Sequence, residues 1–265
     1  LVPIKTAGKK PPIFLIHGGE LNVLLFKSIN EYFDEDQPIY GIQALGLSHE
    51  TDIPQTIEGI AARYINDMLK VYPSGPYAVA GYSLGGFFAF EIAKQLKEMG
   101  KEILFLGIMD TYAGNNIESG NKGVRTFNKV KRQFRKLPFF TKSFVKYPKE
   151  SFEYQVGYVN RVLFRDKTQV YVPENIFTEY EKEIFRKYSA AHNAYVLKPA
   201  DVQITLFRVE KRLYYIDDFV HLGWGKLALK GVNVQQIPGD HKTFLYPPNS
   251  KKFAGIIQRM LDSIS

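Results

Sequence analysis

The chain has 265 residues, 45% of them hydrophobic and 23% charged, which suits one large α/β domain or two small ones. The absence of cysteine excludes disulfides and thiolate metal sites and fits a reducing, cytoplasmic setting, and the chain has no run of 18 apolar residues that would predict a membrane span. The net charge of +8 comes with no nucleic-acid-binding motif, so we expect neither a nucleic-acid nor a membrane partner.

The chain begins with a polar segment and then a short apolar run. Residues 1–12 contain three lysines, three prolines and one glycine, so we interpret them as a linker-like N-terminus. The first residue is Leu1 rather than methionine, which favours an excised domain or a processed product. Residues 13–16 are all apolar and end at His17, which predicts a buried parallel strand followed by a glycine loop at Gly18 and Gly19.

Strands and helices then alternate along the chain. Short apolar runs predict strands at residues 13–16, 39–42, 77–80, 103–109, 202–207 and 231–237. Apolar residues at helical spacing predict helices at residues 22–33, 56–72, 87–99 and 249–264. This alternation predicts an α/β fold in which helices cover both faces of a mostly parallel sheet.

The most informative motif is Gly81-Tyr82-Ser83-Leu84-Gly85, which lies between a predicted strand and a predicted helix. A side chain on so sharp a turn is held in a strained backbone conformation, with its oxygen pushed out of the sheet. The residues two before and two after Ser83 must be small, because the strand and helix backbones nearly touch there. Gly81 and Gly85 meet that need, so we predict that Ser83 is a nucleophile.

A serine hydroxyl needs a base to take its proton, and the base is usually a histidine oriented by a carboxylate. His241 follows the last predicted strand, where enzymes with this serine turn keep their base. Asp110 directly follows the apolar strand at 103–109. An acid half buried at that edge of the sheet is unfavourable unless it has a role, so Asp110 is a candidate. The alternative acids lie in a charged segment after the following strand: Glu210, Asp217 and Asp218. We favour Asp110 and expect no metal.

The backbone N–H groups of Leu84 and Gly19 are the expected oxyanion hole, because one follows the nucleophile and the other lies in the first loop. We expect His17 to orient that loop as a structural residue. Asp240 adjoins His241, and since neighbouring side chains diverge, we expect it to fix the loop. No positional argument singles out the remaining histidines, which we interpret as surface or packing residues: His49, His192 and His221.

Residues 111–199 interrupt the pattern and form a predicted lid insertion, because so long a segment between sheet strands usually covers a site. We expect it to be mostly helical, with helices at residues 123–136, 149–164 and 179–196. Residues 121–150 hold ten lysines or arginines and one acid, a charge of +9, while the rest of the chain carries −1. This segment suits either an acidic protein partner or a solvated helix face.

Several blocks of the sequence resemble the thioesterase domains that end nonribosomal peptide and polyketide synthetases. The blocks are residues 12–19, 38–47, 75–86, 104–112, 223–224 and 238–241. The resemblance implies one α/β-hydrolase domain over residues 1–265, and it favours Asp110, because in that family the acid follows the strand after the nucleophile helix. The first loop differs from the family pattern: Gly18 replaces a proline, and Glu20 and Leu21 stand where glycines are usual.

The resemblance also implies a substrate and a partner. A carrier protein, expected as an upstream domain of the same synthetase, would present an acyl or peptidyl chain as a thioester on its 4′-phosphopantetheine arm, with no other cofactor. Ser83 would take the chain as an ester, and water or an internal amine or hydroxyl would release it as an acid or a ring. Such carriers are commonly acidic, so a docking patch is expected on the basic segment, at Lys131, Arg132, Arg135 and Lys136.

Two other interpretations compete with this one. A stand-alone serine esterase or editing thioesterase would use the same three residues. A catalytically silent hydrolase fold would only bind a ligand or a partner. The presence of Ser83, Asp110 and His241 together argues against the silent fold, because a binding module does not need all three.

Overall fold

The computed structural model describes residues 1–48, 50, 52–114, 136–164 and 177–264. Its centre is one seven-stranded sheet in the order β1-β3-β2-β4-β5-β6-β7, parallel throughout except for the antiparallel β1–β3 pair. The strands are β1 (Val2–Lys5), β2 (Ile13–Ile16), β3 (Ile39–Ile42), β4 (Tyr77–Tyr82), β5 (Ile103–Met109), β6 (Ile204–Val209) and β7 (Val232–Ile237). The predicted α/β fold with a mostly parallel sheet is confirmed.

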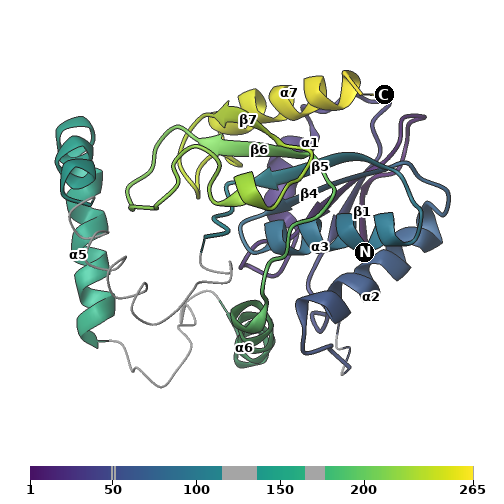
Figure 1. Cartoon of the computed structure of the whole chain (residues 1–265), viewed down its shortest axis with the longest axis horizontal. Coiled ribbons are helices and arrows are strands. Elements are labelled where there is room, and N and C mark those ends of the chain that lie inside the picture. The colour runs from purple at the N-terminus through teal and green to yellow at the C-terminus, as the bar shows by residue number, and fades with distance from the viewer. Residues whose placement is uncertain (49, 51, 115–135, 165–176, 265) are drawn as a thin grey trace.

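Helices cover both faces of this sheet (Figure 1). One face carries α2 (Ile57–Val71) and α3 (Gly85–Glu98), and the other carries α1 (Lys27–Asn30) and α7 (Asn249–Asp262). Two further helices come from the insertion, α5 (Pro148–Phe164) and α6 (Glu179–Ala194). Two short 3₁₀ turns are also present, η1 (Leu24–Phe26) and η2 (Trp224–Lys226).

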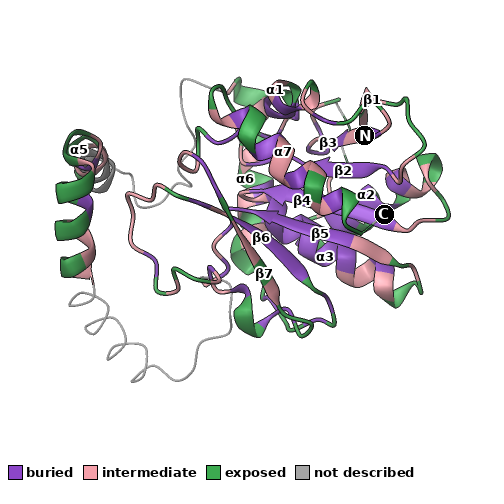
Figure 2. Ribbon diagram, turned by 90° about the horizontal axis from the view of Figure 1, so that it is seen from above, coloured by how far each residue is buried: buried purple, intermediate pink, exposed green. Residues whose placement is uncertain are grey.

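The central strands β2, β4 and β5 carry no charged or amide side chain because both of their faces are buried, as Figure 2 shows. Successive side chains point to opposite faces, so each strand feeds two separate cores. In β2, Phe14 and Ile16 pack with α2 and α3, while Ile13 and Leu15 pack with α1 and α7. The strand at 103–109 is confirmed to the residue, because a fully apolar run leaves its bounds unambiguous.

Local signals in the sequence place the helix ends. Thr56 caps α2, and its hydroxyl accepts the Gly59 N–H at 3.1 Å. Thr178 and Glu181 form a reciprocal capping box at the start of α6. Gly100 has a φ of 73°, and its N–H donates to the Lys97 carbonyl, so it ends α3 as expected.

Two expectations near the N-terminus are wrong. Residues 1–12 are not wholly linker-like, because residues 2–5 form β1 at the edge of the sheet and pair with β3. The predicted helix at 22–33 shrinks to η1 and α1. Asn22 accepts the Leu24 N–H before these turns, and an Asp34 carboxylate oxygen accepts the Asp36 N–H after them, so two side-chain turns bound a shorter helical stretch.

The insertion is helical where the structure describes it. The predictions at 149–164 and 179–196 agree with α5 and α6, and residues 136–146 are also helical. The predicted helix at 123–136 lies outside the described residues except for its last position. Within the described ranges, every helix is too short or too polar to cross a membrane.

Candidate active site

Ser83 occupies the sharp turn between β4 and α3. Its φ is 53°, in the left-handed region that a side chain rarely adopts. A Cβ on Gly81 would lie 2.0 Å from the Gly85 carbonyl oxygen, and one on Gly85 would lie 2.4 Å from the His17 carbonyl oxygen. The Ser83 N–H donates to the Met109 carbonyl at 3.1 Å, which ties the turn to the end of β5. The glycines are therefore required by lack of room.

Asp110 follows β5 directly and is also held in the left-handed region, with a φ of 52°. Its N–H donates to the Phe207 carbonyl at 2.8 Å, so β6 fixes its backbone. Its side chain is buried, and one carboxylate oxygen accepts the Val209 N–H at 3.3 Å. A buried carboxylate in strained backbone is unusual, and such positions cluster at functional sites.

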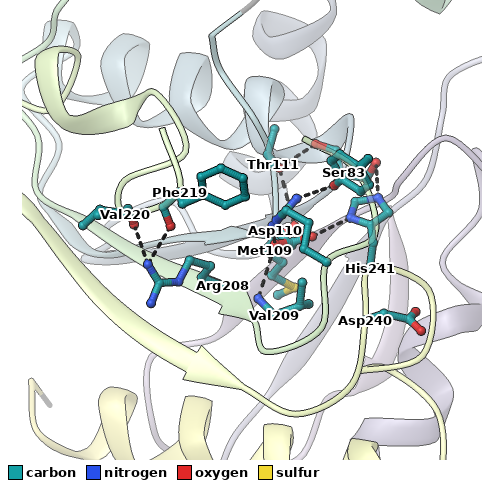
Figure 3. A network of polar contacts seen from close by, with 12 residues as sticks. Ser83, Met109, Asp110, Thr111, Arg208, Val209, Phe219, Val220, Asp240 and His241 are labelled. Carbon is teal, nitrogen blue, oxygen red and sulfur yellow. Dashed lines mark hydrogen bonds and ion pairs between the residues drawn. The ribbon is translucent and has the colours of Figure 1, made fainter. Parts of the chain in front are cut away.

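His241 lies between Ser83 and Asp110 (Figure 3). Its Nδ1 is 2.8 Å from Asp110 Oδ2, and its Nε2 is 3.2 Å from Ser83 Oγ. With the proton on Nδ1, the ring donates to the carboxylate and Nε2 is free to accept the serine proton. The Tyr82 hydroxyl donates to the His241 carbonyl at 2.8 Å, and so steadies the loop that carries the histidine. The structure thus brings together the three predicted residues.

The neighbouring acids have other roles. An Asp240 oxygen accepts the N–H groups of Lys242 and Thr243, so Asp240 fixes the loop as expected. The Asp218 carboxylate accepts three backbone N–H groups, those of Val220, His221 and Gly223. Asp110 is therefore the acid that bonds His241.

The segment after Asp110 is held separately, because the indole N–H of the buried Trp224 donates to the Thr111 carbonyl at 2.8 Å.

Arg212 is the functional neighbour that the sequence did not indicate. It forms an ion pair with Asp110 Oδ1, and its side chain is only 7% exposed. The guanidinium also bonds the Tyr214 hydroxyl and lies 4.8 Å from the centre of that ring. Asp110 therefore offers one oxygen to Arg212 and the other to His241. Nothing in the sequence of the loop after β6 singles out Arg212, because only the folding of the chain brings its partner Asp110 next to it.

A cavity of about 360 Å³ opens beside the serine. Its walls come from the first loop, from α3 and the turn before it, from the loops after β5, β6 and β7, and from α6: Gly19, Ser83, Leu84, Phe87, Asp110, Thr111, Tyr112, Phe185, Ser189, His192, Tyr214 and His241. His192 is a packing residue, one of the two roles expected for it: its ring lies edge-on to that of Phe87, with the ring centres 4.5 Å apart, and it also lines this cavity. Burial lowers the pKa of His192, which keeps this wall neutral.

The predicted oxyanion-hole residues line the same cavity. Leu84 begins the turn into α3, where helix N–H groups point outward, and Gly19 comes from the loop after β2. His17 is buried, and burial lowers its pKa to about 4. A neutral, enclosed His17 agrees with its expected structural role.

Of the four predicted docking residues, the structure describes one. Lys131, Arg132 and Arg135 fall outside the described residues, and Lys136 is half-buried at the start of the helical stretch 136–146, apart from the cavity beside Ser83. Among the described side chains, no group of three histidines or acids converges as metal ligands do.

Comparison with known proteins places these residues in a family. The sequence model of the thioesterase domain matches residues 11–144. An inactive atromentin synthetase, invA3 of Paxillus involutus, is 42% identical over 113 residues, and an atromentin synthetase of Tapinella panuoides is 40% identical over 110. These matches cover 43% and 42% of the chain and only 12% of each synthetase, so the chain corresponds to a small part of such proteins.

The fold has solved counterparts. The NocB thioesterase domain, in covalent complex with a fluorophosphonate nocardicin G analog, superposes with a TM-score of 0.66 over 96% of both chains at 20% identity. At that identity the likeness concerns the fold, which is the α/β-hydrolase fold.

Proposed function

Because the chain belongs to the thioesterase domain family, we propose that it releases an acyl or peptidyl chain held as a thioester on the phosphopantetheine arm of a carrier protein. The observation that carries the proposal is the contact of His241 with both Ser83 and Asp110 beside an open cavity. The similarity to a short part of long synthetases supports a carrier that is an upstream domain of the same protein.

In the first half-reaction, Ser83 Oγ attacks the thioester carbonyl carbon while His241 Nε2 takes the serine proton. The carbonyl oxygen becomes an oxyanion that accepts the N–H groups of Leu84 and Gly19. Collapse of this intermediate breaks the C–S bond, and His241 returns the proton to the departing pantetheine thiol. Asp110 accepts the hydrogen bond from Nδ1–H throughout, and its negative charge stabilises the imidazolium that forms when Nε2 takes the serine proton.

In the second half-reaction, His241 takes a proton from water, or from an amine or hydroxyl of the bound chain. The oxygen or nitrogen attacks the ester carbon, the bond to Ser83 Oγ breaks, and His241 returns the proton to the serine. The product is a free acid when water attacks, and a ring when the chain attacks itself. The same three residues serve both outcomes, so the shape of the cavity and its water content select between them.

We also propose that residues 111–199 act as a lid within one domain. The support comes from α6, which belongs to this segment and lends Phe185, Ser189 and His192 to the cavity. Tyr112 comes from the same segment, at its first turn. Phe87, Phe185 and the rings of Tyr112 and Tyr214 make the cavity suitable for an apolar acyl chain.

The decisive experiment is intact-protein mass spectrometry after incubation with acyl or peptidyl thioesters of a pantetheine mimic. Wild type should gain the mass of the acyl group and then lose it as free acid or ring, whereas Ser83→Ala should gain none. Absence of both adduct and turnover with every thioester, together with cleavage of simple esters, would favour the stand-alone esterase.

A catalytically silent domain is the second candidate, and one observation favours it: two of the similar synthetases, at 42% and 40% identity, are named inactive. A fluorophosphonate probe separates the two candidates, because it bonds only to an activated serine. Labelling of wild type at Ser83, absent in Ser83→Ala and strongly reduced in His241→Ala, is the expected result. A wild type that stays unlabelled would support the silent domain.

Docking of an acidic carrier on the basic segment is part of the same proposal. Neutralising Lys131, Arg132, Arg135 and Lys136 should raise KM about tenfold for a carrier-bound thioester at low salt and spare a small soluble thioester, because only the carrier meets the patch. The matched control neutralises four exposed lysines elsewhere, Lys27, Lys226, Lys251 and Lys252. Equal losses on both substrates, or equal losses in the control, would contradict this docking site.

A further inference from the structure

A buried chain of hydrogen bonds joins α6 to the loop that carries Gly19. The Leu45 N–H donates to the Tyr188 hydroxyl at 2.7 Å, and that hydroxyl lies 2.8 Å from the Tyr64 hydroxyl. The Tyr64 hydroxyl lies 2.9 Å from His17 Nε2, and His17 Nδ1 lies 2.6 Å from the Gly18 carbonyl oxygen. The three side chains are each at most 2% exposed and come from α6, α2 and the end of β2.

The positions of the protons in this chain follow from its two ends. A carbonyl oxygen only accepts, so the 2.6 Å contact with Gly18 requires the proton on His17 Nδ1. Burial lowers the pKa of His17 to about 4, so the ring is neutral and Nε2 must accept from Tyr64. At the other end the Leu45 N–H only donates, which leaves the Tyr188 proton to be given to Tyr64. Every bond therefore runs in one direction, from Leu45 to the Gly18 carbonyl.

The last of these hydrogen bonds, from His17 Nδ1 to the Gly18 carbonyl, sets the orientation of the Gly18–Gly19 peptide plane. In a trans peptide the carbonyl of Gly18 and the N–H of Gly19 point in opposite directions. The Gly18 oxygen is held on the buried side by His17 Nδ1–H and by the Leu21 N–H at 3.2 Å. The Gly19 N–H must then point away from the buried ring, on the side where Gly19 lines the cavity with Ser83.

At the other end of this chain of hydrogen bonds is Tyr188, which belongs to α6. Tyr188 lies on the same helix as Phe185, Ser189 and His192, which line the cavity. A second tyrosine of α6, Tyr180, donates to the Gly46 carbonyl at 2.8 Å, so the helix is fixed on the loop after β3 at two points. A shift of α6 would move Tyr188 and release Tyr64 from its place.

We propose that Tyr188 and Tyr64 are positioning residues that make the direction of the Gly19 N–H depend on the seating of α6. The oxyanion hole is complete only when this helix of the insertion is in place, so the cavity wall and the donor that receives the developing charge are set together. The inference rests on the proposed function, because it assigns Gly19 to the oxyanion hole of that reaction.

The test uses Tyr64→Phe and Tyr188→Phe, which remove one hydroxyl each and keep the rings. With the octanoyl thioester of N-acetylcysteamine, Tyr64→Phe should lower kcat about tenfold and leave KM within about twofold, because a misaligned donor weakens the transition state and not substrate binding. Labelling of Ser83 by a fluorophosphonate should slow by a similar factor. Tyr188→Phe should show a smaller loss, about threefold, and the double variant should lose no more than Tyr64→Phe alone.

The matched control is Tyr77→Phe. The Tyr77 side chain is also buried, and its part-buried hydroxyl donates to the Tyr72 carbonyl at 2.7 Å, at the opposite end of β4 from Ser83. Tyr77→Phe should lose some stability and keep its kcat. Circular dichroism and urea unfolding confirm folding of each variant, and if Tyr64→Phe does not fold, Tyr188→Phe carries the test.

Three results would overturn the proposal. They are an unchanged kcat in both folded variants, a rise in KM without a change in kcat, or additive losses in the double variant. Failure of the proposed function looks different, because wild type itself would then neither turn over thioesters nor be labelled at Ser83. In that case the assignment of Gly19 falls with it.

Discussion

Asp110 divides its two carboxylate oxygens between Arg212 and His241. The ion pair with Arg212 is buried, with side-chain exposures of 7% and 0%, so neither charge is well solvated and each depends on the other. Arg212 also holds the carboxylate in one orientation, together with the Val209 N–H. The oxygen that faces His241 is thereby fixed by groups that do not touch the reacting atoms.

Replacement of this arginine should affect both stability and rate. We expect Arg212→Met to lower the free energy of unfolding by about 3 kcal/mol, because it leaves Asp110 without its buried cation. In the folded fraction, kcat should fall by about one to two orders of magnitude as the carboxylate loses its fixed orientation. Arg212→Lys keeps the charge without the planar fork, and should recover part of the rate. Urea unfolding and thioester turnover measure the two effects.

Arg208 provides a matched control for that prediction. It comes from the same strand end, but its guanidinium donates to the Phe219 and Val220 carbonyls and has no described contact with Asp110. Arg208→Met should therefore lose stability and keep its rate. An Arg212→Met enzyme that folds and turns over at the wild-type rate would contradict the role of Arg212.

At the scale of the residue, the sequence indicates the positions that the chain order constrains. Ser83 and Asp110 follow strands whose ends meet at one edge of the sheet, and His241 follows the last strand in the same way. Arg212 and His192 carry no such mark. Their roles depend on the path of a loop and on which face of α6 turns inward, and both are decided by packing between elements distant in sequence.

At the scale of the element, Gly81, just before the turn from β4 into α3, is required by lack of space and not by its backbone conformation. Gly81 has an ordinary φ, yet a Cβ there would overlap the Gly85 carbonyl. Gly100, at the other end of α3, has a φ of 73° and open space around it. Gly81, before α3, and Gly100, after it, are thus required for different physical reasons.

These reasons predict different costs for the same substitution. Gly81→Ala must move backbone against backbone, so we expect a loss of at least about 3 kcal/mol or failure to fold. Gly100→Ala meets only the strain of the left-handed conformation, about 1 kcal/mol. Urea unfolding of both variants gives the comparison. Equal costs would show that the crowding at Gly81 is relieved by small movements.

The elements that the sequence predicts well have clear signals at their ends. The strand at 103–109 is a continuous apolar run, and the amphipathic helix at 56–72 begins after its cap residue Thr56 and ends before Pro73. The sequence does not indicate β1, because an edge strand that is half-exposed and contains Pro3 and Lys5 has the composition of a linker. The predicted helix at 22–33 is longer than the observed one because its apolar spacing extends through Tyr32 and Phe33. The N–H groups of these residues donate to carbonyls only three residues back, so this stretch forms turns instead of α-helix.

At the scale of the whole molecule, the buried His17 links folding to pH. Burial lowers its pKa to about 4 in the folded chain, while the unfolded chain has the ordinary value near 6.5. Between these values the unfolded state binds the proton and the folded state does not. The stabilising contribution is therefore complete above pH 6.5, declines as the pH falls, and is lost below pH 4.

The size of this effect is measurable. From pH 7 to pH 5, His17 should remove about 2 kcal/mol from the free energy of unfolding. Burial also lowers the pKa of His192, and both His192 and the surface carboxylates reduce stability as the pH falls. Measurements on wild type alone therefore cannot isolate the contribution of His17. The comparison is with His17→Gln, which keeps a polar side chain but cannot titrate, and whose stability should fall by about 2 kcal/mol less over the same interval.

Urea unfolding of both proteins at pH 7 and pH 5 provides the test. NMR titration of the His17 imidazole in wild type checks the same claim without a variant, and should show a neutral ring down to about pH 4. A His17 that titrates near 6.5, or equal pH slopes for the two proteins, would contradict it. With a pKa near 6.5, His17 would take a second proton on Nε2 in mildly acidic solution. Nε2 could then no longer accept from Tyr64, and the one-way hydrogen bonding between α6 and the Gly19 loop would be lost there.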